Sequence, residues 1–255
     1  MITLASDFGS PYPAAMKGVL LGRTDARLVD VAHDFPRQDV RTAAFWLREV
    51  LPYFPPAVHL VVVDPGVGTD RAALAIRAGD HALVGPDNGV LLPAARELAN
   101  ASGATDVEVF EVEYEDSETQ STTFHGRDVF APAAAEVHET GVGRFHERED
   151  VVPGDGYDDL RFPEPETEDE IAVGEVLVVD GFGNAVTNVP GRFLDGRESV
   201  RVDGTSAPVE RAYAAVDAGQ RLVTVGSHGN VELAVNRGRG EAAFGVSVGD
   251  EVRLS

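Results

Sequence analysis

The periodicity of the apolar residues changes after about residue 150, and this change constrains the fold of the 255-residue chain most strongly. In the first part, short apolar runs typical of buried strands alternate with segments of helical periodicity. In one of these, Val40, Ala43, Ala44 and Leu47 follow the spacing of a single buried helix face. Strands are expected at 2–6, 28–32, 59–63, 73–77, 81–84 and 107–112, and helices at 14–23, 40–51, 91–98 and 128–138. This alternation predicts an α/β domain with a mostly parallel sheet between two layers of helices.

The remainder of the chain has strand-like runs separated by Gly, Asp and Asn turns, with almost no helical periodicity. The runs lie at 175–180, 185–188, 199–202, 221–225, 231–235 and 251–254. They predict a small antiparallel β-barrel, with a sandwich as the alternative. A stretch rich in acidic residues and proline precedes them. We therefore expect an α/β catalytic domain at 1–150, an acidic linker at 151–170 and a β-barrel domain at 171–255.

Acidic residues outnumber basic ones, 43 against 21, and Lys17 is the single lysine. This balance argues against nucleic acid as a partner. An acidic, lysine-poor surface suits a halophilic protein, because very high salt screens the repulsion between like charges; an ordinary acidic protein is the alternative. No apolar run reaches the ~18 residues of a membrane span. The segment MITLASDFGS also lacks a signal-peptide pattern, so we expect no membrane contact and a cytoplasmic protein.

Three polar segments of the first part stand where functional residues are often found. Asp7 follows the first strand, where a carboxylate can accept both hydroxyls of a ribose; a helix N-cap is the alternative. Asp64 begins a Gly-rich turn that reaches Arg71, so the two side chains either share a site or form a plain salt bridge. His125 stands at the predicted start of a helix, a frequent setting for catalysis, with a structural role as the alternative.

Several common chemistries are excluded by what the sequence lacks. The turn after Asp64 has no Gly-Lys-Ser/Thr ending, and its two glycines do not make a dinucleotide fingerprint. No HExxH or comparable spacing predicts a metal site. The absence of cysteine removes disulfides, thiolate metal sites and cysteine nucleophiles. Catalysis is therefore expected to use oxygen and nitrogen groups without a metal.

Two turns in the second part combine glycine with polar side chains, DGFGN at 180–184 and GSHGN at 226–230. Both compositions are typical of β-turns that need no function. Asp180, Asn184 and Ser227 become candidate binding residues only together with the polar segments of the first part.

Seven motifs follow one another along the chain: SDFG, MKG, DPGVGTDR, PDNG, FHGRD, DGFGN and SHGN-x-ELAVN. In this order they resemble the S-adenosylmethionine (SAM) hydrolase family, also called SAM hydroxide adenosyltransferases, over essentially the whole chain. That family is similar to the bacterial fluorinases and chlorinases, which use a halide where the hydrolases use water. The resemblance implies an N-terminal α/β domain, a C-terminal β-barrel, a homotrimer, and a SAM site at the junction between subunits.

Carried over residue by residue, the catalytic Asp/Arg/His set of the hydrolases matches Asp64, Arg71 and His125. The halogenases lack the Asp and the His of this set, so the resemblance favours water over halide. It also implies SAM contacts at Asp7 for the ribose, at Asp180 and Asn184 from the second domain, and at Ser227 for the methionine end. The chain departs from the family in a short loop at 10–13 and from the halogenases in His228, which replaces their arginine.

The resemblance implies hydrolysis of SAM to adenosine and L-methionine by in-line attack of water on C5′, with SAM as substrate and no separate cofactor. The sulfonium leaves as a neutral thioether, so the site must act on the water. Arg71 would favour deprotonation through charge-assisted bonds, while Asp64 and His125 would orient the water and pass on its proton. Two alternatives stay open: a halogenase that makes 5′-chloro-5′-deoxyadenosine, and a sensor that binds SAM or adenosine without turnover.

Overall fold

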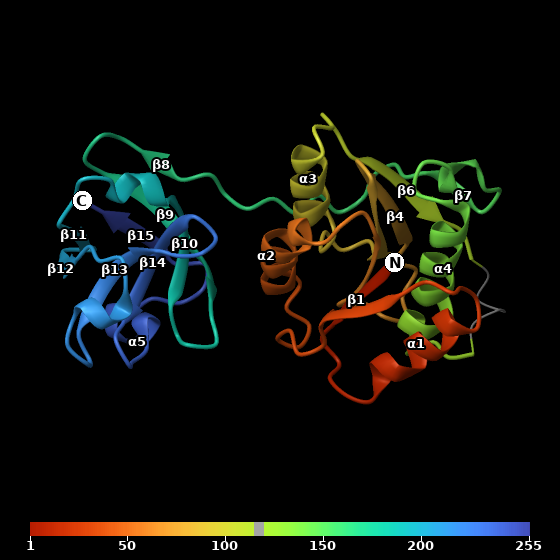
Figure 1. Ribbon diagram of the computed structural model, residues 1–255, viewed down its shortest axis with the longest axis horizontal. Helices are drawn as coiled ribbons and strands as arrows, with labels where there is room; N and C mark the ends of the chain where they lie inside the picture. Colours follow the sequence, from red (N-terminus) through yellow and green to blue (C-terminus); the bar gives the residue numbers. More distant parts are fainter. Residues whose placement is uncertain (115–119) are drawn as a thin grey trace. The chain divides into compact units, whose positions relative to one another are not determined.

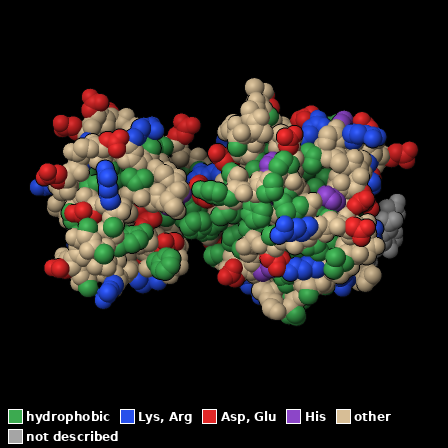
Figure 2. All heavy atoms as spheres, in the orientation of Figure 1, with side chains coloured by type: hydrophobic (Ala, Val, Ile, Leu, Met, Phe, Trp, Pro, Cys, Tyr) green, Lys and Arg blue, Asp and Glu red, His purple; other side chains and the backbone are tan. Residues whose placement is uncertain are grey.

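The computed structural model describes residues 1–114 and 120–255 (Figure 1). The chain divides into two compact units, Met1–Arg161 and Phe162–Ser255. The range 151–170, expected as a linker, contains two short strands, β7 (Val151–Pro153) in the first unit and β8 (Glu166–Thr167) in the second. Figure 2 shows Asp and Glu side chains spread over the visible face of both units, in keeping with the formal net charge of -22. Within the described ranges, no helix is long and apolar enough to span a membrane.

A mixed seven-stranded sheet forms the middle of the first unit, with the strand order β2-β1-β3-β5-β4-β6-β7. Its first four strands in this order are parallel, and the last three continue it antiparallel. Besides β7, the strands are β1 (Ile2–Ser6), β2 (Leu28–Ala32), β3 (Val58–Val62), β4 (Ala73–Ala78), β5 (His81–Pro86) and β6 (Glu108–Val112). Every residue of β1, β3 and β5 is buried, which explains why apolar residues predominate in them.

Helices cover both faces of this sheet, so the predicted three-layer α/β architecture is confirmed (Figure 1). On one face lie α1 (Tyr12–Leu21), the short π-helix η3 (Gly126–Phe130) and α4 (Ala131–Thr140). On the other lie α2 (Val40–Val50), the 3-10 turn η1 (Leu51–Tyr53) and α3 (Leu92–Ala101). A further 3-10 turn, η4 (Phe145–Glu147), precedes β7. The helix expected at 128–138 thus begins later as an α-helix, because a π-helical turn occupies its first residues.

A chain of buried polar side chains joins the three central parallel strands. The Nδ1 atom of His59 on β3 lies 2.7 Å from Oγ1 of Thr3 on β1, and its Nε2 atom lies 2.9 Å from Nδ1 of His81 on β5. His59 has no exposed surface. Burial, together with the neighbouring His81, lowers the pKa of His59 to about 3. The neutral imidazole is therefore part of the folded core.

The second unit is a single eight-stranded antiparallel sheet in which the strand order is β12-β11-β15-β9-β10-β14-β13 and β8 adds to β9. Its longer strands are β9 (Ala172–Val179), β10 (Ala185–Pro190), β11 (Ser199–Val202), β12 (Thr205–Pro208), β13 (Arg221–Val225), β14 (Asn230–Val235) and β15 (Glu251–Leu254). A bridge between Val209 and Val223 links the two outer strands, so the sheet is a nearly closed barrel. Three short helical turns complete it: η5 (Gly191–Leu194), η6 (Tyr213–Ala215) and α5 (Gly240–Phe244). The predicted antiparallel β-barrel is confirmed.

Candidate active site

Asp64 and Arg71 form an ion pair in the turn that follows β3. Nε of Arg71 lies 3.1 Å from Oδ1 of Asp64, and the same oxygen accepts a hydrogen bond from the Gly66 amide at 3.0 Å. Nη1 of Arg71 donates to the carbonyl oxygen of Asp87, which directly follows β5. The Asp64 side chain is 5% exposed and that of Arg71 24%. The pair is therefore fixed by backbone atoms from the ends of two neighbouring strands.

The pKa of the Asp64 carboxyl group is raised, chiefly because burial penalises its charged form. Arg71, the Gly66 amide and His125 oppose this effect, while the charge of Asp7 adds to it. Arg71 and the Gly66 amide contact Asp64 directly, and His125 and Asp7 act on it electrostatically. A carboxylate with a raised pKa is a stronger base than an exposed aspartate, and such shifts are frequent at functional sites.

His125 is brought to this turn by close packing of two loops. Gly68, at φ +84, approaches the loop before His125 so closely that a Cβ atom there would lie 2.7 Å from the carbonyl oxygen of Thr122. His125 itself precedes the π-helix η3 and is 6% exposed. Its ring packs against the edge of Tyr114 at a centroid distance of 6.0 Å. The close approach of Gly68 thus holds the loop before His125, and the Tyr114 ring packs against the imidazole itself.

Asp7 enters the same region from the end of β1. Its Oδ2 atom accepts a hydrogen bond of 2.6 Å from the backbone amide of Gln38. The helix that follows, α1, has Pro11 as its N-cap and no side-chain capping bond, so Asp7 does not cap it. The carboxylate instead ties the end of β1 to the loop after β2.

These side chains surround a cavity of about 470 Å³, a size typical of small-molecule sites. Asp7, Asp64 and His125 all line it. Arg71 is not part of the lining and reaches the cavity through Asp64. The structure therefore brings the candidate residues of the first unit together around one pocket.

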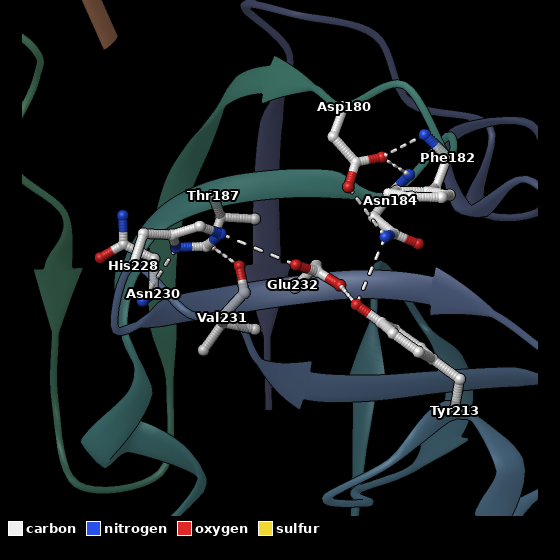
Figure 3. Close-up of polar contacts among 9 residues, drawn as sticks. All are labelled: Asp180, Phe182, Asn184, Thr187, Tyr213, His228, Asn230, Val231 and Glu232. Carbon is white, nitrogen blue, oxygen red and sulfur yellow. Dashed lines mark hydrogen bonds and ion pairs between the residues drawn. The ribbon is translucent and has the colours of Figure 1, made fainter. Parts of the chain in front are cut away.

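In the second unit, Asp180 and Asn184 belong to the turn between β9 and β10. Oδ1 of Asp180 accepts the backbone amides of Phe182 and Asn184 at 2.9 and 2.8 Å, and its Oδ2 accepts Nδ2 of Asn184 at 3.0 Å (Figure 3). Ser227 lies exposed in the turn between β13 and β14. Asp180 thus uses most of its acceptor capacity to hold its own turn and the Asn184 side chain.

No group of three or more His, Cys, Asp or Glu side chains within residues 1–114 and 120–255 is arranged to hold a metal ion. The pocket lining itself includes the carboxylates of Asp7 and Asp64 and the imidazole of His125.

Comparison with known proteins gives a match over nearly the whole sequence. The model of the SAM hydroxide adenosyltransferase N-terminal domain matches residues 2–146, and that of the C-terminal domain matches residues 174–253. This chain belongs to the SAM hydroxide adenosyltransferase family. The resemblance indicated by the seven ordered motifs is therefore confirmed.

Individual SAM hydroxide adenosyltransferase relatives agree with this membership. The (R)-S-adenosyl-L-methionine hydrolase of Salinispora tropica is 41% identical over 260 residues, covering 100% of this chain and 97% of the relative. The hydrolase of the same name from Thermus thermophilus is 41% identical over 273 residues, with 98% and 97% coverage. A solved structure of an uncharacterized conserved protein from Thermotoga maritima has a TM-score of 0.83 and 35% identity, covering 100% and 99% of the two chains.

Several pocket groups of this family member were not singled out by the sequence reasoning. The rings of Phe8, Tyr12 and Phe124 line the cavity and meet edge to face at centroid distances of 5.6 to 6.3 Å. Gln38 contributes its backbone amide to Asp7, and Asp87 contributes its carbonyl oxygen to Arg71. Asp87 belongs to the PDNG motif noted in the sequence. A contact made by a backbone atom does not require a particular residue type, so the sequence does not reveal it.

Proposed function

We propose that this protein hydrolyses SAM to adenosine and L-methionine. Membership of the SAM hydroxide adenosyltransferase family supports this proposal, as do curated relatives at 41% identity that carry the name (R)-S-adenosyl-L-methionine hydrolase. The observation that carries it is the buried Asp64 carboxylate, paired with Arg71, on the wall of a cavity that also holds His125 and Asp7.

Water attacks C5′ of SAM, the C5′–S bond breaks, and the electron pair of that bond leaves with sulfur as the neutral thioether of methionine. The water loses one proton, so the products are adenosine, methionine and H⁺. A positioned base commonly accelerates such a step by ~10²–10⁴-fold. Oδ1 of Asp64 is engaged by Gly66 and Arg71, whereas Oδ2 has no hydrogen-bond partner among the described residues. Asp64 would therefore hold the water through Oδ2, with His125 orienting it or accepting the proton.

Arg71 favours the charged form of the Asp64 carboxyl group and so opposes the effect of burial, which supports the role of Asp64 as an acceptor. Asp7 would bind the ribose hydroxyls through the oxygen that Gln38 does not occupy. Asp180, Asn184 and Ser227 are assigned to the same substrate from the second unit, in a homotrimer as the family resemblance implies. Analytical ultracentrifugation of the purified protein measures its oligomeric state and tests the homotrimer. SAM is the substrate, and no separate cofactor is part of the proposal.

The decisive experiment incubates the purified protein with SAM and a metal chelator and identifies the products by chromatography and mass. Adenosine and methionine in equal amounts are expected, and His125→Ala should abolish them. His138→Gln, a substitution on α4 away from the cavity lining, is the matched control and should leave turnover unchanged. A chlorinated nucleoside that forms only when chloride is present would indicate a halogenase instead. Tight SAM binding without turnover would indicate a sensor.

A further inference from the structure

A continuous chain of polar contacts crosses the second unit and includes side chains that the reaction scheme above does not use. It runs from Asp180 through Asn184 and Tyr213 to Glu232 and His228 (Figure 3). Nδ2 of Asn184 donates to the Tyr213 hydroxyl oxygen at 3.4 Å, and that hydroxyl donates to Oε1 of Glu232 at 2.6 Å. The other Glu232 oxygen lies 3.6 Å from Nε2 of His228.

The direction of each bond in this chain follows from the donors and acceptors available. The pKa of Tyr213 is raised by burial of the phenol and by the neighbouring Glu232 carboxylate, so the phenol stays protonated. A carboxylate only accepts, so the single phenol hydrogen points to Glu232. The phenol oxygen is then left to accept from Asn184. Glu232 is 4% exposed, which makes an unpaired oxygen there costly and the arrangement strongly preferred.

These hydrogen-bond directions determine which end of the Asn184 amide is available to a ligand. Both N–H groups of Asn184 have acceptors, one in Asp180 and one in Tyr213. Its Oδ1 atom has no hydrogen-bond partner among the described residues, and Figure 3 shows it pointing away from both. Without the Tyr213 hydroxyl, the amide nitrogen would keep only the 3.0 Å bond to Asp180, and the direction of Oδ1 would be less closely fixed.

We propose that Tyr213 and Glu232 are positioning residues for SAM binding, which lock the Asn184 amide so that its carbonyl oxygen accepts a bond from a hydrogen-bond donor of the substrate. The inference rests on the proposed function for its ligand, but the lock itself lies within the second unit. Tyr213 and Glu232 act through Asn184 and take no part in bond cleavage. Their loss should therefore affect KM and leave kcat nearly unchanged.

The test uses Tyr213→Phe, which removes only the hydroxyl oxygen and its hydrogen. We expect KM for SAM to rise roughly five- to ten-fold, the effect of one lost hydrogen bond, with kcat within about two-fold of wild type. In an Asn184→Ala background, the same substitution should change KM by less than about two-fold, because the two residues act as a unit. Tyr53→Phe, at a tyrosine that is 85% exposed, is the matched control and should behave as wild type.

Glu232 is tested by a conservative and a disruptive variant. Glu232→Gln retains an oxygen that can accept the Tyr213 hydrogen and should keep KM within about two-fold of wild type, whereas Glu232→Ala should resemble Tyr213→Phe. An unchanged KM in Tyr213→Phe would overturn the proposal. So would an equal rise in the Asn184→Ala background, because Tyr213 would then act independently of Asn184.

The orientation of the Asn184 amide can also be measured without turnover, so this test does not depend on the proposed function. In the wild type, both side-chain amide hydrogens of Asn184 should be protected from exchange with solvent in NMR spectra, and one should lose protection in Tyr213→Phe. If the wild type does not hydrolyse SAM, the proposed function fails while this result still decides the positioning role. Equal exchange of the amide hydrogens in both proteins would refute the lock.

Discussion

A methyl group at Gly66 would displace the Arg71 guanidinium without removing any functional group. A Cβ atom built at Gly66 lies 2.1 Å from Nη2 of Arg71 and 2.7 Å from its Nε. The backbone of Gly66 does not have a positive φ, so alanine is compatible with it. The colliding atoms are the end of a flexible side chain. Gly66→Ala should therefore move the arginine and leave the fold in place.

The size of the effect follows from the required movement. Non-bonded heavy atoms need a separation of roughly 3.5 Å, so the guanidinium must shift by about 1.4 Å from its position beside Asp64. A misplacement of about 1 Å in a catalytic arrangement can lower the rate about 10²-fold. We expect kcat of Gly66→Ala to fall about 100-fold. The free energy of unfolding should change little. Alanine lowers the conformational entropy of the unfolded chain, which stabilises the folded state by about 0.4–1 kcal/mol and offsets part of the cost of the collision.

The assay follows adenosine release from SAM by chromatography, with Tm measured for each variant. Gly143→Ala is the matched control, since a methyl group there meets nothing within 4 Å. It should keep full activity. If Gly66→Ala has wild-type Tm and a kcat within about two-fold of wild type, the position of Arg71 is not part of the chemistry and the reasoning is refuted.

Three further outcomes are expected. Asp64→Asn should lower kcat by ~10²–10⁴-fold, and Asp25→Asn, at an exposed acid, is the control variant. Because burial raises the pKa of Asp64, the acid limb of the wild-type pH profile should lie above the ordinary aspartate value of 3.8. The His59 imidazole has a folded pKa of about 3 against 6.5 when unfolded, so its stabilisation is present above 6.5 and decreases as pH falls towards 3. Denaturant titrations should show a loss of about 2 kcal/mol between pH 7 and pH 5 that His59→Gln largely removes, and an identical loss in the variant would argue against this assignment. Dialysis against a metal chelator should leave kcat unchanged, and activity that returned only with an added divalent cation would contradict the metal-free scheme.

Much of the pocket was predictable because strand ends have a clear sequence signal. Asp7 and Asp64 each follow a buried, mostly apolar strand, and parallel strands deliver their carboxyl ends to the same edge of a sheet. Helical periodicity also located the segment that begins after His125. A π-helical turn and an α-helix have similar apolar patterns over a few residues, so the sequence did not separate η3 from α4.

The remaining contacts depend on tertiary packing between residues of ordinary type. The amide of Gln38 binds Asp7 through a backbone atom, and any residue there supplies the same atom. Tyr213 and Glu232 are distant in sequence and meet only because η6 packs beside β14. Glu232 stands in the SHGN-x-ELAVN motif, whereas Tyr213 stands in none of the seven motifs. The pairing of the two side chains has no local pattern, so only the folded structure identifies it.

The order of the parallel strands also determines when during folding the protein can become active. Asp7 and Asp64 are separated by 57 residues of sequence and Asp64 and His125 by 61, yet all three line one cavity. Asp7 and Asp64 meet there because β1 and β3 are neighbours in the sheet. No short fragment contains the set, and no local element can assemble it. Recovery of turnover after dilution from denaturant would thus report the completion of long-range strand pairing, later than the recovery of helical signal by circular dichroism.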